Sequence, residues 1–152
     1  MPKSFTDYRG YGFWANDAIL EAWLAALADI VPSDAPPWLG EAQRAWYELA
    51  GVGFMGCVDA SLDGMLTSPG RVQVILELAT SAMEHVRGLA DGTGYLPAQW
   101  LNERHISGEL SWTSGNIRLD YVEQVAGAFT SLLRGELQTT PATSPVLPRP
   151  SP

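Results

Sequence analysis

The glycine-rich string Gly51–Gly56 (GVGFMG) has the spacing of a dinucleotide-binding turn. Such a turn needs a strand before it and a helix after it, so that the pyrophosphate of the cofactor meets free backbone amides. Here a helical pattern (AWYELA) precedes the string and a polar connector follows it. We therefore interpret these glycines as a helix break and predict no cofactor.

Carboxylate, imidazole and thiol groups are present, but they lack the spacing of a metal or catalytic site. Asp59 and Asp63 flank a tight segment (DASLDG) without the alternating oxygen ligands and late glutamate of a calcium loop. His85 and His105 belong to no ligand spacing such as Glu-x-x-His. Cys57 could meet His105 and an acid in space as a thiol triad, yet a lone cysteine is more often a small core residue. The sequence predicts no metal, no catalytic set and no enzyme.

The acidic and aromatic first part of the chain is the feature that best indicates a function. The net charge is −8, and residues 10–70 hold eight acids and a single basic residue, Arg44. Carboxylates on such a surface would pair with the Lys and Arg of a partner, while exposed aromatic rings would anchor it. We predict a partner-binding surface that comprises Asp17, Glu21, Asp29, Asp34, Glu41, Trp14 and Trp38.

These features favour an acidic, cytosolic protein-binding module of the inhibitor or immunity-protein kind, which neutralises a basic toxin or enzyme. The likeness to small immunity proteins is one of charge and size and not of motif. One alternative is a self-assembling structural or accessory subunit that forms a homodimer. Another is a small-molecule-binding helical domain with a pocket near Trp100, Trp112 and His105.

The composition argues against several classes of binding partner and several cellular locations. The acidic balance argues against nucleic acid and against anionic membrane, because both require clustered positive charge. One cysteine allows no internal disulfide, and MPKSFTDYRG lacks the apolar segment of a signal peptide. The longest nearly apolar run, Ala22–Val31, is too short to span a bilayer. The predicted compartment is the cytoplasm.

The stretch Tyr11–Val31 is the predicted centre of the fold, as an amphipathic helix that Asn16 or Asp17 caps. One side is an apolar stripe of Leu20, Trp23, Leu24, Leu27, Ile30 and Val31. The other side carries small residues between acids, namely Ala18, Ala22, Ala25 and Ala28. We expect this alanine-and-carboxylate side to face a second helix, a basic partner or a second copy of the chain.

Local signals place the other helices. Proline at the first helical position predicts helices from Pro37 and from Ser68-Pro69, which Gly51 and Gly92 end. Asp120 and Glu123 have the spacing of a capping box before a last helix that ends at Gly135. A short helix in Pro97–Asn102 and a small hairpin in Ile106–Leu119 are predicted between them.

The predicted fold is all-α, a bundle of about four main helices with an irregular or short β-hairpin insert before the last helix. Residues 1–136 are predicted to form a single helical domain, in which residues 1–14 are an aromatic arm lying across the helices. Residues 137–152 are proline-rich, and we predict a disordered or polyproline-like tail there.

Overall fold

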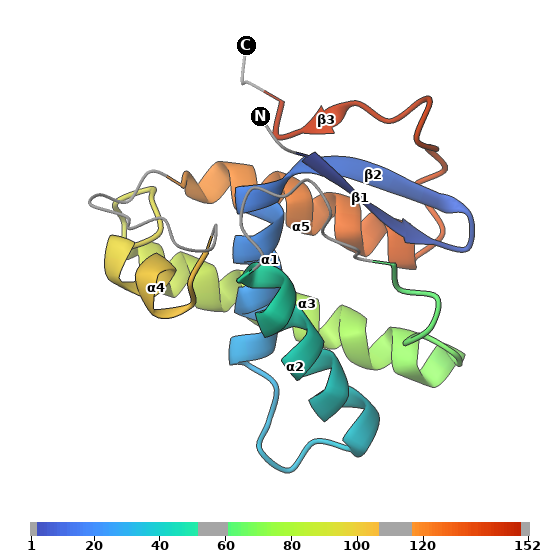
Figure 1. The fold of residues 1–152 in the computed structure, drawn as a ribbon, viewed down its shortest axis with the longest axis horizontal. Coiled ribbons are helices and arrows are strands. Elements are labelled where there is room, and N and C mark those ends of the chain that lie inside the picture. Colours follow the sequence, from blue (N-terminus) through green and yellow to red (C-terminus); the bar gives the residue numbers. More distant parts are fainter. Residues whose placement is uncertain (1–2, 52–60, 107–116, 150–152) are drawn as a thin grey trace.

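The computed structural model describes residues 3–51, 61–106 and 117–149. Within these ranges the chain forms a three-stranded mixed sheet beside five helices (Figure 1). The strands are β1 (Lys3–Tyr8), β2 (Tyr11–Asn16) and β3 (Val146–Leu147), and the helices are α1 (Asp17–Asp29), α2 (Pro37–Ala50), α3 (Pro69–Ala90), α4 (Ala98–Glu103) and α5 (Leu119–Leu133). The prediction of an all-α bundle is therefore wrong, although most of the described residues that lie in regular elements are helical. None of the described helices is long and apolar enough to cross a membrane.

Helix α1 is the element around which the others pack. Its N-terminus is capped by Asn16, whose side-chain oxygen accepts hydrogen bonds from the amides of Ala18 (3.0 Å) and Ile19 (3.4 Å). Every residue from Asp17 to Ala28 is buried. Helices α2, α3 and α5 pack around α1, and the β1–β2 hairpin packs across α1 and α5 (Figure 1). The predicted central helix is present, and it begins at Asp17 with Asn16, one of the two predicted capping residues, as its cap.

Strands β1 and β2 form an antiparallel hairpin where an aromatic arm was expected. The turn residues Arg9 (φ +52°) and Gly10 (φ +84°) are both left-handed, as in a two-residue turn of type I′. The inward positions of β1 are Ser4, Thr6 and Tyr8, all buried. Because two of the three are polar, β1 lacks the apolar alternation by which a half-buried strand is normally detected.

The segment after Leu137 lies along the open edge of β2. The backbone N–H of Gly12 donates to the carbonyl of Thr139 (2.8 Å), and the Thr139 hydroxyl donates to the carbonyl of Gly12 (2.6 Å). Further along, the Ser144 hydroxyl accepts from the Trp14 amide (3.1 Å), and β3 pairs with β2 in parallel. The prediction of a disordered tail is wrong for residues 137–149. A segment poor in apolar groups is held here because its polar groups satisfy the backbone of an edge strand.

The remaining helices follow their local signals with one exception. Helices α2 and α3 begin at the predicted prolines, and the Ser68 hydroxyl caps α3 by accepting from the Arg71 amide (3.3 Å). The predicted capping box does not form, since α5 begins at Leu119. The Asp120 carboxylate instead pairs with the guanidinium of Arg118 at 2.6 and 2.9 Å. Most of the predicted hairpin between Ile106 and Leu119 lies outside the described residues.

Candidate functional site

The alanine-and-carboxylate side of α1, predicted to be a contact surface, is buried inside the protein. Asp17 and Glu21 are both 0% exposed, and the Ser4 hydroxyl donates to the Asp17 carboxylate over 2.7 Å. The alanines of the same side, Ala18, Ala22, Ala25 and Ala28, are also buried. Of the three alternatives left open by the sequence, packing against other helices of the chain is the one that the structure shows, and Asp17 and Glu21 are not accessible to a partner. Packing of the hairpin and of three helices on α1 covers all its sides.

The other predicted contact residues are spread over the molecule. Asp34 and Glu41 are exposed, on the α1–α2 loop and on α2. Trp14 is half-buried, and its indole N–H donates to the carbonyl of Pro141 (2.9 Å). Trp38 is half-buried beneath the guanidinium of Arg71, 4.9 Å from the ring centroid. The two tryptophans are thus engaged within the chain, whereas the two acids face solvent.

Asp29 is the centre of the most connected polar cluster among the described residues. Its Oδ1 accepts hydrogen bonds from the Tyr47 hydroxyl (2.6 Å) and from Nε of Arg104 (2.8 Å). Its Oδ2 accepts from Nε2 of His85 (3.0 Å), Nε1 of Trp100 (2.8 Å) and Nε of Arg104 (2.9 Å). We call these five residues the Asp29 cluster. They join the end of α1 to α2, α3 and α4, four elements that only tertiary packing brings together.

The geometry of the Asp29 cluster suits a structural role better than a catalytic one. The Asp29 side chain is 5% exposed, and each of its oxygens already accepts at least two hydrogen bonds. A carboxylate has about four lone-pair sites, so little capacity remains to take a proton from a substrate. The cluster therefore fixes the orientation of its donors, above all Tyr47 and Arg104.

The ionisation of Asp29 and Tyr47 reflects this environment. Burial by itself raises the pKa of Asp29, but the hydrogen bonds from Arg104, Tyr47, His85 and Trp100 outweigh it, so the pKa lies below the ordinary 3.8. Burial, followed by the bond to the Asp29 carboxylate and its negative charge, raises the pKa of Tyr47 to about 12. The phenol consequently stays a donor and the carboxylate stays an acceptor at neutral pH.

We expect the Asp29 cluster to make the protein acid-sensitive. Because the folded-state pKa of Asp29 is lowered, its stabilisation is complete above about pH 4 and is lost as the pH falls through the lower folded-state value. Urea unfolding of the native protein and of Asp29→Asn between about pH 5 and pH 2 measures this. The difference in unfolding free energy between the native protein and Asp29→Asn should become smaller as the pH falls, because protonation of Asp29 removes its negative charge. The other carboxylates are common to both proteins, so their effects cancel in this difference. A gap that stays constant over this range would contradict the assignment.

One member of the cluster is also part of the surface. Tyr47 is 37% exposed although its hydroxyl is bonded to Asp29. Beside it lies a cavity of about 350 Å³, lined by Tyr47, Glu103, Arg104 and His105 among the described residues. Sequence reasoning missed this site, but Asp29 offered a signal. A carboxylate in the last turn of a helix opposes the helix dipole, so its presence there suggests a tertiary partner.

Most of the residues that the sequence suggested for a cofactor, metal or catalytic role lie outside the described residues, namely Val52–Gly56, Cys57, Asp59 and Trp112. Asp63 is described, and it accepts a hydrogen bond from the Arg9 amide (2.9 Å). In the described ranges, no group of three or more His, Cys, Asp and Glu residues is placed to hold a metal ion. His85 belongs to the Asp29 cluster, and His105 (φ +55°) is exposed beside Tyr47.

No protein-family model matches the chain, and comparisons with curated proteins and with solved structures find no match either. A function has therefore to be inferred from the side chains and surfaces themselves.

Proposed function

We propose that this protein is a protein-binding module that takes a basic partner on the outer side of α2, as an inhibitor or immunity protein does. The proposed contact surface, called here the α2 face, comprises Asp34, Glu41, Tyr47, Glu48 and Glu103. It keeps two residues of the sequence-based surface, Asp34 and Glu41. It replaces the buried carboxylates of α1 with acids that solvent reaches.

The main support for the proposal is that Tyr47 is exposed and yet held in one orientation. An aromatic ring that is 37% exposed is held in one orientation by a 2.6 Å hydrogen bond to a buried carboxylate. Tyrosine is among the residues that contribute most at protein interfaces. Because its rotamer is already restrained, binding would remove little conformational freedom from this side chain. An exposed but pre-oriented ring beside a cavity is thus suited to anchor a partner.

Charge on the α2 face supports a basic partner. Glu41, Glu48 and Glu103 are exposed, as is Asp34, and Arg44 is the exposed basic residue on α2. Glu41 and Glu48 are seven residues apart, which places them on one side of the helix. Arg104 lies close to this region, but its charge is paired with Asp29 and Glu103. The remaining negative field would speed association with a cationic surface and weaken with added salt.

A binding experiment tests the α2 face. Purified protein is used to capture partners from its native cell extract at low salt, the retained protein is identified and purified, and its Kd is measured by titration calorimetry. We expect Tyr47→Ala to weaken binding by about tenfold or more, since truncating an interface anchor typically costs about 2 kcal/mol or more and tenfold corresponds to about 1.4 kcal/mol. Glu48→Lys should weaken binding and reduce its dependence on salt.

Two matched variants separate contact from folding. Tyr47→Phe removes the hydroxyl bond to Asp29 but keeps the ring, so its affinity should stay closer to the native value than that of Tyr47→Ala. Glu136→Lys makes the same charge change as Glu48→Lys at an exposed position beyond α5, and it should leave the Kd within about twofold. Native affinity in both Tyr47→Ala and Glu48→Lys would overturn the proposed surface.

A further inference from the structure

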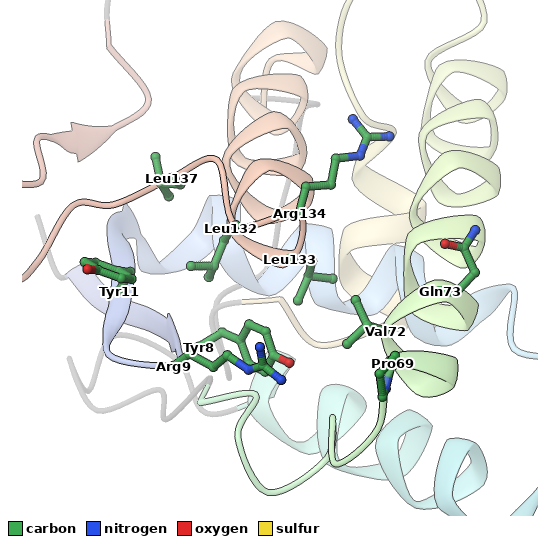
Figure 2. A pocket seen from close by; sticks show the side chains of 11 residues that line it. Tyr8, Arg9, Tyr11, Pro69, Val72, Gln73, Leu132, Leu133, Arg134 and Leu137 are labelled. Atoms are coloured by element: carbon green, nitrogen blue, oxygen red, sulfur yellow. The ribbon is translucent and has the colours of Figure 1, made fainter.

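A second cavity lies under the hairpin turn, well separated in the chain from the α2 face. It has a volume of about 350 Å³ and lies between the hairpin tip, the start of α3 and the end of α5 (Figure 2). We call it the hairpin pocket. Figure 2 shows Tyr8 and Arg9 on one side, with Leu132 and Leu133 of α5 facing them and Val72 of α3 beside them.

The charge of the hairpin pocket is opposite to that of the whole chain. The net charge is −8, yet the charged residues among the described lining residues are two arginines, Arg9 and Arg134, and no carboxylate. Within the described part of the chain neither guanidinium makes an ion pair. Arg9 lies beside Tyr8, with its guanidinium carbon 5.3 Å from the ring centroid. Among the described residues, the Arg9 guanidinium is thus held against an aromatic ring and makes no ion pair.

Arg9 occupies a turn position whose left-handed backbone an arginine does not favour. A type I′ turn prefers Asn, Asp or Gly at this position, because their left-handed conformation is the least costly. Here an arginine takes φ +52°, and its amide is held by the Asp63 carboxylate at 2.9 Å. Strained residues of this kind gather at binding sites, where the side chain has a use that offsets the strain.

Apart from the two arginines and Gln73, most of the side chains that line the hairpin pocket are apolar. Val72, Leu132, Leu133 and Leu137 contribute aliphatic groups, and Tyr8 contributes its ring. Ligand pockets in proteins typically combine such walls with one or a few polar groups that orient the ligand. The volume suits a small molecule and is too small for a folded partner.

We propose that the hairpin pocket binds a small amphipathic carboxylate, whose aliphatic body lies against Val72 and the leucines and whose carboxylate pairs with Arg9. A guanidinium matches the planar carboxylate with two parallel hydrogen bonds, and the apolar walls exclude water from the chain. Arg134, at the end of α5, also lines the pocket, but Figure 2 shows its side chain directed away from Arg9.

Decanoate, a ten-carbon monocarboxylate, is the probe. Titration calorimetry at concentrations where it is monomeric should show saturable binding to the native protein. Decyltrimethylammonium has the same chain and the opposite charge, and it should bind at least about tenfold more weakly. Equal binding of the two, or no binding of decanoate, would overturn the proposal.

Arg9→Asn separates ligand binding from folding. Asparagine suits the left-handed turn position better than arginine, so the melting temperature measured by circular dichroism should stay equal or rise. Decanoate affinity should nevertheless fall by about tenfold or more, because the charged partner is lost. Arg9→Lys should retain part of the affinity, and Arg44→Gln, on the exposed side of α2, should retain all of it. Native decanoate affinity in Arg9→Asn would contradict the role of Arg9.

Discussion

Replacing Asp29 with alanine is expected to lower the free energy of unfolding by about 3 kcal/mol or more. The carboxylate is 5% exposed and accepts from Tyr47, His85, Trp100 and Arg104. Without it, these donors lose their shared acceptor and a partly buried guanidinium loses its counter-charge. Urea unfolding at neutral pH, followed by tryptophan fluorescence, measures the change.

Two further variants identify the cause. Asp29→Asn keeps the volume but exchanges one acceptor oxygen for a donor, so it should be destabilised to a similar extent. Asp34→Asn removes the charge of an exposed acid on the loop that follows α1, and its unfolding free energy should change by no more than about 0.5 kcal/mol. A loss below about 1 kcal/mol in Asp29→Ala would mean that the cluster does not hold the four helices together.

Gly12→Ala is expected to disrupt the hairpin, with a loss of about 3 kcal/mol. A Cβ at this position would lie 2.0 Å from the carbonyl oxygen of Thr6 and 2.9 Å from the Cα of Asp7. Both are backbone atoms of the paired strand, so no side-chain rotation relieves the clash. Gly12 also exchanges two hydrogen bonds with Thr139, so any shift of β2 disturbs the segment that follows α5 as well.

Gly40→Ala is the matched control for this substitution. Gly40 lies in α2, and a Cβ there would meet no atom within 4 Å. Alanine is favoured over glycine inside a helix, so the control should gain about 0.5–1 kcal/mol in the same urea experiment. If both variants changed stability by the same amount, the close approach of β1 and β2 at Gly12 would not be a constraint on the fold.

Helix boundaries were the part of this fold that the sequence predicted well. Asn16, Pro37 and Ser68 act on backbone groups within about one turn of themselves, so their effect does not depend on the rest of the molecule. The exception is Asp120, where a neighbouring arginine took the carboxylate that a capping box requires. Local competition of this kind is not visible in a spacing pattern alone.

The sheet was not predicted because many of its buried and hydrogen-bonding residues are polar. Ser4 and Thr6 point inward from β1, and Thr139 and Ser144 bind the edge of β2 through backbone and hydroxyl groups. Hydrophobic periodicity detects buried side chains only when they are apolar. A segment with few apolar residues was accordingly interpreted as disordered, although its hydrogen bonds reach across more than a hundred residues.

The same limit applies to the acids of α1. By composition, Asp17, Glu21 and Asp29 indicated a surface, since carboxylates are seldom buried. Asp17 is hydrogen-bonded to Ser4, thirteen residues away, and Asp29 is bonded to donors 18, 56, 71 and 75 residues away. Only the folded chain decides which acids remain exposed, and Asp34, Glu41, Glu48 and Glu103 of the α2 face are among them.

The sequence by itself therefore determined the acidic balance, the central position of α1 and the starts of α2 and α3. These follow from composition and from contacts within a few residues. Tertiary structure alone decided that α1 is buried on all sides, that the chain after Leu137 completes a sheet, and that Arg9 faces a cavity. Each of these depends on groups that are distant in the chain, and their meeting is set by the packing of the whole molecule.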